Sequence, residues 1–86
     1  KENLLKKEEF FSGSIIVNLP EYDKDSLHQI QRKYDHIIKT HIHQCLSNEV
    51  EMNIFVIEGK GNEIKAFIRA LEKIPKVDSV KLILAI

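Results

Sequence analysis

Two helical stripes of apolar residues, separated by two consecutive strand patterns, most constrain the fold of this chain. The stripes consist of Leu27, Ile30 and Tyr34, and then of Ile64, Phe67, Ile68 and Leu71. Intervals of three and four residues place apolar side chains on one face of a helix. Between the stripes the apolar period changes to two, over residues 36–46 and again over 50–59. This change predicts two strands joined by a hairpin through the "SNE" turn.

A β-branched run precedes the first stripe, and another follows the second. "GSIIVNL" spans residues 13–19, and "VDSVKLILAI" spans residues 77–86. Helices are expected over 23–35, capped by Asp23, Asp25 or Ser26, and from Asn62, itself a helix cap, to just before Pro75. The predicted order is β-α-β-β-α-β. With right-handed crossovers, this order gives an α+β ferredoxin-like plait, a four-stranded antiparallel sheet with two helices on one face.

Length and composition limit the number of domains and the possible partners. A chain of 86 residues is one domain, which we assign to residues 13–86, and residues 1–12 are interpreted as an N-terminal helix or linker. Thirteen basic residues balance thirteen acidic ones, so we do not expect this chain to bind DNA by itself. The first residue is lysine, which suggests a piece of something longer. A DNA-binding part would then lie outside this segment.

Location is inferred from what the sequence lacks. It contains no apolar run near the ~20 residues of a membrane span and no signal peptide pattern, so we expect a cytoplasmic protein without membrane contact. A single cysteine, Cys45, cannot form an internal disulfide, and nothing therefore implies secretion.

The stretch "THIHQC" carries the chemistry most specific to this sequence. His41, His43 and Cys45 recur at every second position, the period of side chains on one face of a strand. Imidazole and thiolate favour nickel, zinc or copper over hard cations. The alternative interpretation is that these are polar side chains on a solvent-exposed strand and bind no metal. Because Ile38 and Ile42 occupy the other phase and are expected in the core, the histidines and Cys45 are predicted to point outward.

Two other features bear on function. His28 and Arg32 lie one helical turn apart and could approach an anion or, for His28, a metal, although a solvated helix face is the alternative. Cys45 as a nucleophile would need a base, an orienting group and a pocket, which the sequence does not reveal, so we do not expect an enzyme.

Two helices can cover only one face of the sheet. The predicted core between helices and sheet consists of Leu27, Ile30, Tyr34, Ile38, Ile42, Ile64, Phe67 and Leu71. The bare face is predicted to carry Ile37, Phe55 or Ile57, and Ile83. An exposed apolar sheet face is typical of a subunit interface, so a homo-oligomer, a dimer or tetramer, is expected.

The run "IQRKYDHIIKTHIHQCLSNEVEMNIFVIEGKGNEI" resembles the metal-binding C-terminal domain of the nickel-responsive transcriptional regulators. The resemblance covers about residues 13–85 and implies an ACT-like plait that tetramerises. That family binds nickel through a helical histidine, a His-x-His pair and a cysteine. Without gaps, Arg32 stands at the helical histidine, His43 and Cys45 at the pair, and Glu51 at the cysteine. In another alignment register, His41 and His43 stand at the His-x-His pair, but the alignment must then be shifted by two residues both before and after this pair.

A second family is also similar. The iron-only hydrogenase system regulators, which are ACT-like too, resemble this chain over "YDHII", "VIEG", "NEIKAFIRALEKIP" and "VDSVK". That family lacks the ligand pattern, and the resemblance to it implies a small ligand-binding or oligomerising domain.

Residues and resemblance together predict an oligomeric ACT-like regulatory domain of a transcriptional regulator that senses a transition metal or small ligand. Nickel or zinc is the expected metal, and the expected metal-site residues are His41, His43, Cys45 and Glu51. DNA would be contacted only through a segment outside this chain. The alternative is a ligand-free oligomerisation or protein-binding ferredoxin-like module.

Overall fold

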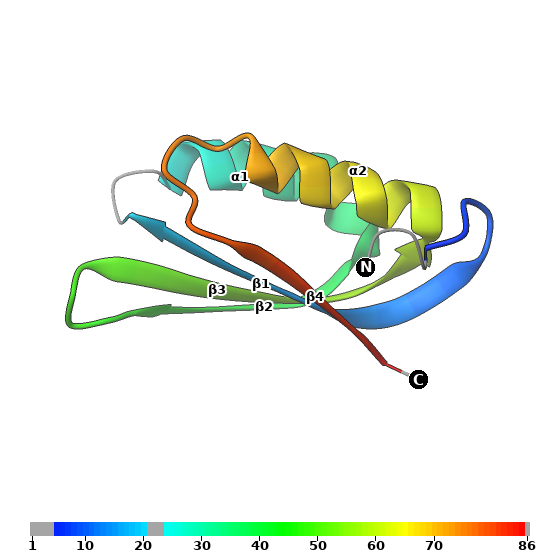
Figure 1. Ribbon diagram of the computed structural model, residues 1–86, viewed down its shortest axis with the longest axis horizontal. Coiled ribbons are helices and arrows are strands. Elements are labelled where there is room, and N and C mark those ends of the chain that lie inside the picture. The colour runs from blue at the N-terminus through cyan, green and yellow to red at the C-terminus, as the bar shows by residue number, and fades with distance from the viewer. Residues whose placement is uncertain (1–4, 21–23, 86) are drawn as a thin grey trace.

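A computed structural model describes residues 5–20 and 24–85 and shows a four-stranded antiparallel sheet with two helices (Figure 1). The strands are β1 (Phe10–Pro20), β2 (Ile38–Cys45), β3 (Val50–Lys60) and β4 (Val80–Ala85), in the order β2-β3-β1-β4. The helices are α1 (Lys24–Lys33) and α2 (Gly61–Glu72), and a 3-10 turn (Asp35–Ile37) links α1 to β2. The predicted element order and the α+β ferredoxin-like plait are confirmed.

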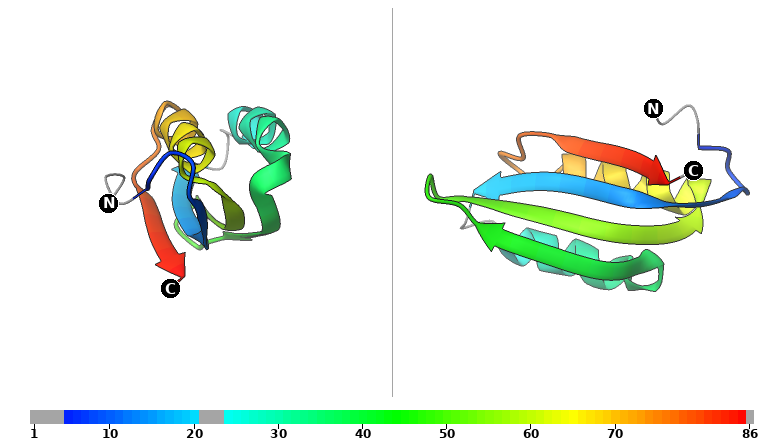
Figure 2. Two further views of the ribbon diagram at one scale, coloured as in Figure 1. Left: turned by 90° about the vertical axis from the view of Figure 1, so that its right-hand side faces the viewer. Right: turned by 90° about the horizontal axis from the view of Figure 1, so that it is seen from below.

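Both helices lie on the same face of the sheet, and the other face is bare (Figures 1 and 2). Helix α2 packs over β1, β3 and β4, and α1 lies beside it. In the end-on view of Figure 2, α1 stands over the side of the sheet that ends at β2. Side chains of α1 and β2 line the cavities of the candidate site between them.

The core forms because alternate residues of β1 and β3 point toward the helices. Ile15 and Val17 of β1 and Phe55 of β3 are fully buried. Phe67 of α2 packs its ring edge-on against Phe55 with 5.3 Å between centroids, and it lies 5.3 Å from the ring of Tyr34. The expected helix stripes therefore do face the sheet. Their members are buried or half-buried: Leu27, Ile30, Tyr34, Ile64, Phe67, Ile68 and Leu71.

The predicted phase of β2 is wrong after its first residue. Ile38 pairs with Ile57, but the next paired residue is Thr40 with Val56, so Lys39 forms a bulge. An extra residue in one strand exchanges the two faces for everything that follows it. His41, His43 and Cys45 therefore lie on the helix-covered side, and Ile42, 52% exposed, lies on the bare face instead of in the core.

The bare face also differs from the prediction in its membership. Ile37, Phe55 and Ile57 are fully buried in the core, because β3 alternates in the opposite phase and Ile37 belongs to the 3-10 turn. Ile83 does lie on the bare face, 55% exposed, together with Ile42 and Val56. The apolar character expected of this face is therefore present, although different side chains supply it.

Residues 5–9 form turns and no helix, and β1 begins at Phe10 rather than at Gly13. The side chain of Leu5 is buried in the core at 1% exposure. This segment replaces Asn62 as the cap of α2, because the carbonyls of Glu9 and Lys7 accept hydrogen bonds from the N–H groups of Gly61 and Asn62, at 2.9 and 3.1 Å. A side chain at Gly61 would collide with the backbone of residues 5 and 6.

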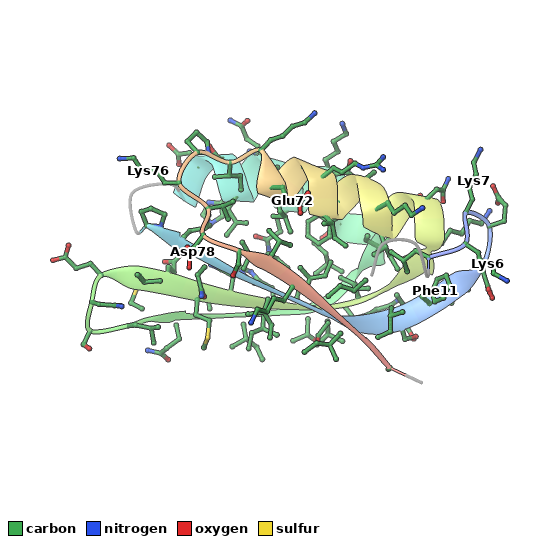
Figure 3. The ribbon with its side chains drawn as sticks, viewed as in Figure 1. Lys6, Lys7, Phe11, Glu72, Lys76 and Asp78 are labelled. Carbon is green, nitrogen blue, oxygen red and sulfur yellow. The ribbon has the colours of Figure 1, made fainter. Side chains whose placement is uncertain are left out.

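Figure 3 shows Lys6, Lys7 and Phe11 at one end of the molecule, away from Lys76 and Asp78 at the other. At the start of α1, Asp25 and Ser26 lie inside the helix and are not its cap, and the third candidate, Asp23, falls outside the described residues. Over the described ranges, neither helix is long and apolar enough to cross a membrane.

Candidate metal and ligand site

The hairpin of β2 and β3 brings the predicted donors together on the helix-facing side of the sheet. The register pairs Cys45 with Glu51, His43 with Asn53, and His41 with Phe55. Directly opposed residues of an antiparallel pair lie on the same face. The bulge at Lys39 thus turns His41, His43 and Cys45, the three candidate metal ligands of β2, toward the edge of the space beneath α1.

His41 is held by contacts from three directions. Its Nε2 lies 2.7 Å from Asn53 Oδ1, which can only accept, so Nε2 carries the proton and donates. Its Nδ1 then accepts a hydrogen bond from Gln31 Nε2 at 3.1 Å. The ring stacks on Phe55, with 4.3 Å between centroids and 9° between planes. His41 therefore ties α1 to β3, and one of these hydrogen bonds would have to break before it could bind a metal.

Cys45 and Glu51 are already close to each other. The Cys45 thiol donates to Glu51 Oε2 across 3.7 Å, between paired positions at the end of the hairpin. Cys45 is exposed, whereas Glu51 is only 3% exposed, which is unusual for a carboxylate. The sulfur of Cys45, a soft donor, and a carboxylate oxygen of Glu51, a hard donor, thus lie next to each other, and solvent reaches them through the exposed Cys45.

A small cavity of about 170 Å³ collects further donors next to this pair. We call it the inner cavity, and its lining includes His28 of α1, His43 of β2 and Glu51 of β3. The sequence placed His28 on a helix face without assigning it to the metal site. Only the position of α1 over β2 shows that His28 faces the same space as His43, and helix periodicity alone carries no such information.

A larger depression of about 460 Å³, which is open to solvent and which we call the outer cavity, shares three lining histidines with the inner cavity. Its lining is His28, Gln31, Arg32, Asp35, His41 and His43. His28, Arg32 and Asp35 are spaced at i, i+4 and i+7, so the end of α1 and the start of the 3-10 turn supply one wall. The strand β2 supplies the other wall through His41 and His43.

The donor chemistry fits nickel or zinc, while the positions of the side chains fit only in part. Imidazole, thiolate and carboxylate are all ligands of these ions. Within residues 5–20 and 24–85, however, no three side chains of His, Cys, Asp or Glu converge closely enough to hold an ion. The rings of His41 and His43, for example, lie 5.9 Å apart between centroids. Completing a site therefore requires rotation of the exposed side chains or a donor from another chain.

Several solved structures share this fold, including the following two. An uncharacterized protein from Thermotoga maritima superposes with a TM-score of 0.83 at 14% identity, over 91% of this chain and all of that chain. The ACT domain from the GTP pyrophosphokinase of Chlorobium tepidum gives a TM-score of 0.74 at 14% identity, over 87% of this chain and all of that one. At such identities these matches establish the fold alone.

The family assignment comes from the sequence pattern. No curated protein sequence matches this chain significantly. The pattern of the family described as the NikR C terminal nickel binding domain matches residues 21–85, which include α1, both hairpin strands, α2 and β4. That range covers most of the chain and all the residues of the two cavities. The chain therefore belongs to the NikR C-terminal nickel-binding domain family.

Proposed function

We propose that this chain is the metal-sensing part of a transcriptional regulator and that it binds nickel or zinc through Cys45, Glu51 and His43. Membership of the nickel-binding family supports the choice of ligand class. The observation that carries the assignment to these residues is the distance of 3.7 Å between Cys45 Sγ and Glu51 Oε2.

This distance has a simple interpretation. A tetrahedral zinc with Zn–S of about 2.3 Å and Zn–O of about 2.0–2.2 Å holds its sulfur and oxygen ligands about 3.6 Å apart. Cys45 and Glu51 therefore stand near the separation of two ligands of one ion, with the thiol proton between them. His43 is the next residue of β2 on the same face, and His28 faces the same inner cavity from α1.

Sensing requires that the metal favour one arrangement of subunits over another. A ligand shifts an equilibrium only by its differential affinity for the two states. The apolar bare face with Ile42, Val56 and Ile83 supports a homo-oligomer, and the exposed side of Cys45 leaves room for a donor from a second copy. The proposed protein is cytoplasmic, and its DNA contacts come from a segment outside these residues.

Metal titration tests the proposal. Purified protein freed of metal with a chelator is titrated with zinc and with nickel, alongside Cys45→Ser, Glu51→Gln and His43→Ala. The control is His36→Ala, because His36 interacts with Glu63 instead of lining either cavity. We expect one tight ion per chain in wild type and control, and weaker binding in the three variants. Equal affinity in all five proteins would refute the proposed ligands.

A second candidate function is a ligand-free oligomerisation or protein-binding module. It is favoured by the bare sheet face, whose Ile42 and Ile83 are more than half exposed. Absence of any metal binding by folded wild-type protein would support this function and would end the metal-sensing proposal.

A further inference from the structure

The outer cavity is lined by ionisable side chains that have no hydrogen-bond or ion-pair partner among the described residues. Arg32, Asp35, His28 and His43 all line it, and none of these side chains makes a hydrogen bond or ion pair with another described residue. Arg32 and Asp35 lie three positions apart, yet they do not pair with each other. Four such groups around one cavity of about 460 Å³ form a polar surface large enough for a small molecule.

The wall behind these groups is fixed by hydrogen bonds. Both ring nitrogens of His41 are hydrogen-bonded, one to Gln31 Nε2 and the other to Asn53 Oδ1, and the ring stacks on Phe55. His41 and Gln31 therefore form a structural wall of the cavity, while Arg32, His28 and His43 remain available to a ligand. A preorganised wall lowers the cost of binding because less of the site must become ordered.

The charges indicate which ligand would be bound. The guanidinium group of Arg32 presents hydrogen-bond donors only, and its planar geometry matches the two oxygens of a carboxylate or phosphate group. Asp35 presents acceptors only, so the same ligand needs a hydrogen-bond donor for it. The histidines can donate or accept.

We propose that the outer cavity binds a small oxyanion that also bears a hydroxyl group, with Arg32 contacting the oxyanion and Asp35 accepting from the hydroxyl. The oxyanion is a carboxylate or a phosphate. His28 and His43 contribute further ring N–H donors from the two walls. Arg32 and Asp35, the two residues that define this site, lie outside the inner cavity. His43 lines both cavities and is a proposed metal ligand, so its contribution to the anion site applies to the metal-free protein.

The test uses metal-free protein and three probes: malate, succinate and inorganic phosphate. Backbone amide shifts of 15N-labelled protein are followed up to about 10 mM of each probe, which suffices to detect a Kd near 1 mM. We expect saturable shifts confined to α1, the 3-10 turn and β2. Malate should bind more tightly than succinate, which lacks the hydroxyl. Phosphate, compared with malate, shows which oxyanion the site prefers.

Matched variants assign the binding to the cavity. Arg32→Gln should weaken binding about 10- to 100-fold, the loss expected for one charge-assisted hydrogen bond. Lys33→Gln removes the same charge from the neighbouring residue, which does not line the cavity, and should change affinity less than about 2-fold at physiological salt. Asp35→Asn should reduce the preference for malate over succinate.

Several results would overturn the proposal. These are the absence of saturable shifts with all three probes, equal losses in Arg32→Gln and Lys33→Gln, or shifts centred on the bare sheet face. Cys45→Ser is expected to bind the probes as wild type does. If Cys45→Ser loses metal but keeps the anion, the two proposals stand separately, and failure of either one can be recognised without the other.

Discussion

Replacing His41 with alanine should destabilise the fold, because this side chain joins α1 to β3 through two hydrogen bonds and a stacked ring. Each hydrogen bond contributes about 0.5–1.5 kcal/mol net, and the stack on Phe55 contributes about 0.5–1.5 kcal/mol. The substitution also leaves Oδ1 of Asn53, a residue with 0% exposure, without its donor, which costs about 1–3 kcal/mol. Because the His41 side of the network is partly open to water, we expect a total near 2–4 kcal/mol.

The assay is urea unfolding of the metal-free protein, followed by circular dichroism. A loss of this size would lower the melting temperature by about 10–25 °C in a domain of this length. His43→Ala is the control, since His43 is exposed on the same strand and makes no hydrogen bond to a described residue; it should change the free energy of unfolding by less than about 0.5 kcal/mol. A double-mutant cycle with Asn53→Ala should give a coupling of at least about 0.5 kcal/mol. Equal stability of the two histidine variants would refute a structural role for His41.

Other substitutions test separate parts of the structure. Phe67→Ala, at a fully buried position, should cost about 3–5 kcal/mol, and wild-type thermal stability would contradict the packing of α2. Gly61→Ala should displace residues 5–9, which hydrogen exchange would report as lost protection of the backbone amides at positions 61 and 62. Glu49→Gly should stabilise by up to about 1 kcal/mol in chemical denaturation, because Glu49 has φ 64° in the hairpin turn. Ile42→Asp should leave the monomer folded but reduce self-association in sedimentation, and an unchanged sedimentation coefficient would argue against the bare face as an interface.

The order of helices and strands was predictable because the apolar residues of each segment repeat at either the helix period or the strand period. Leu27, Ile30 and Tyr34 identify α1, and the stripe through Phe67 identifies α2, without any knowledge of what they pack against. Their order along the chain then leaves few topologies. The plait could therefore be predicted from the sequence.

The face of the sheet on which the candidate site lies could not be predicted, because it is set by a bulge at a single residue. Lys39 forms a bulge, and no pattern in the sequence distinguishes a bulged lysine from a paired one. With the bulge, His43 and Cys45 exchange faces with Ile42, and the candidate site moves from the bare face to the space beneath α1. His28 was considered as a residue that could approach a metal but was not assigned to the site, because only the placement of α1 brings it to β2. The capping of α2 by residues 7 and 9 likewise depends on a tertiary contact.

The pairing of Cys45 with Glu51 across the hairpin agrees with the sequence analysis, which named both residues as candidate ligands. Glu51 was a candidate from the resemblance, and the register places it opposite Cys45 on the same face. Its burial at 3% exposure was not predictable, because an isolated glutamate in a strand is usually exposed.

X-ray absorption of the zinc- or nickel-loaded protein tests the central claim most directly, because it identifies the atoms bound to the metal. The chain contains one cysteine, so binding through Cys45 of a single chain predicts one sulfur per metal. For zinc the sulfur should lie at about 2.3 Å and the nitrogen and oxygen ligands at about 2.0–2.2 Å. Cys45→Ser should lose the sulfur shell and keep the lighter ligands. A metal bound by nitrogen and oxygen alone in the wild-type protein would contradict the proposed site.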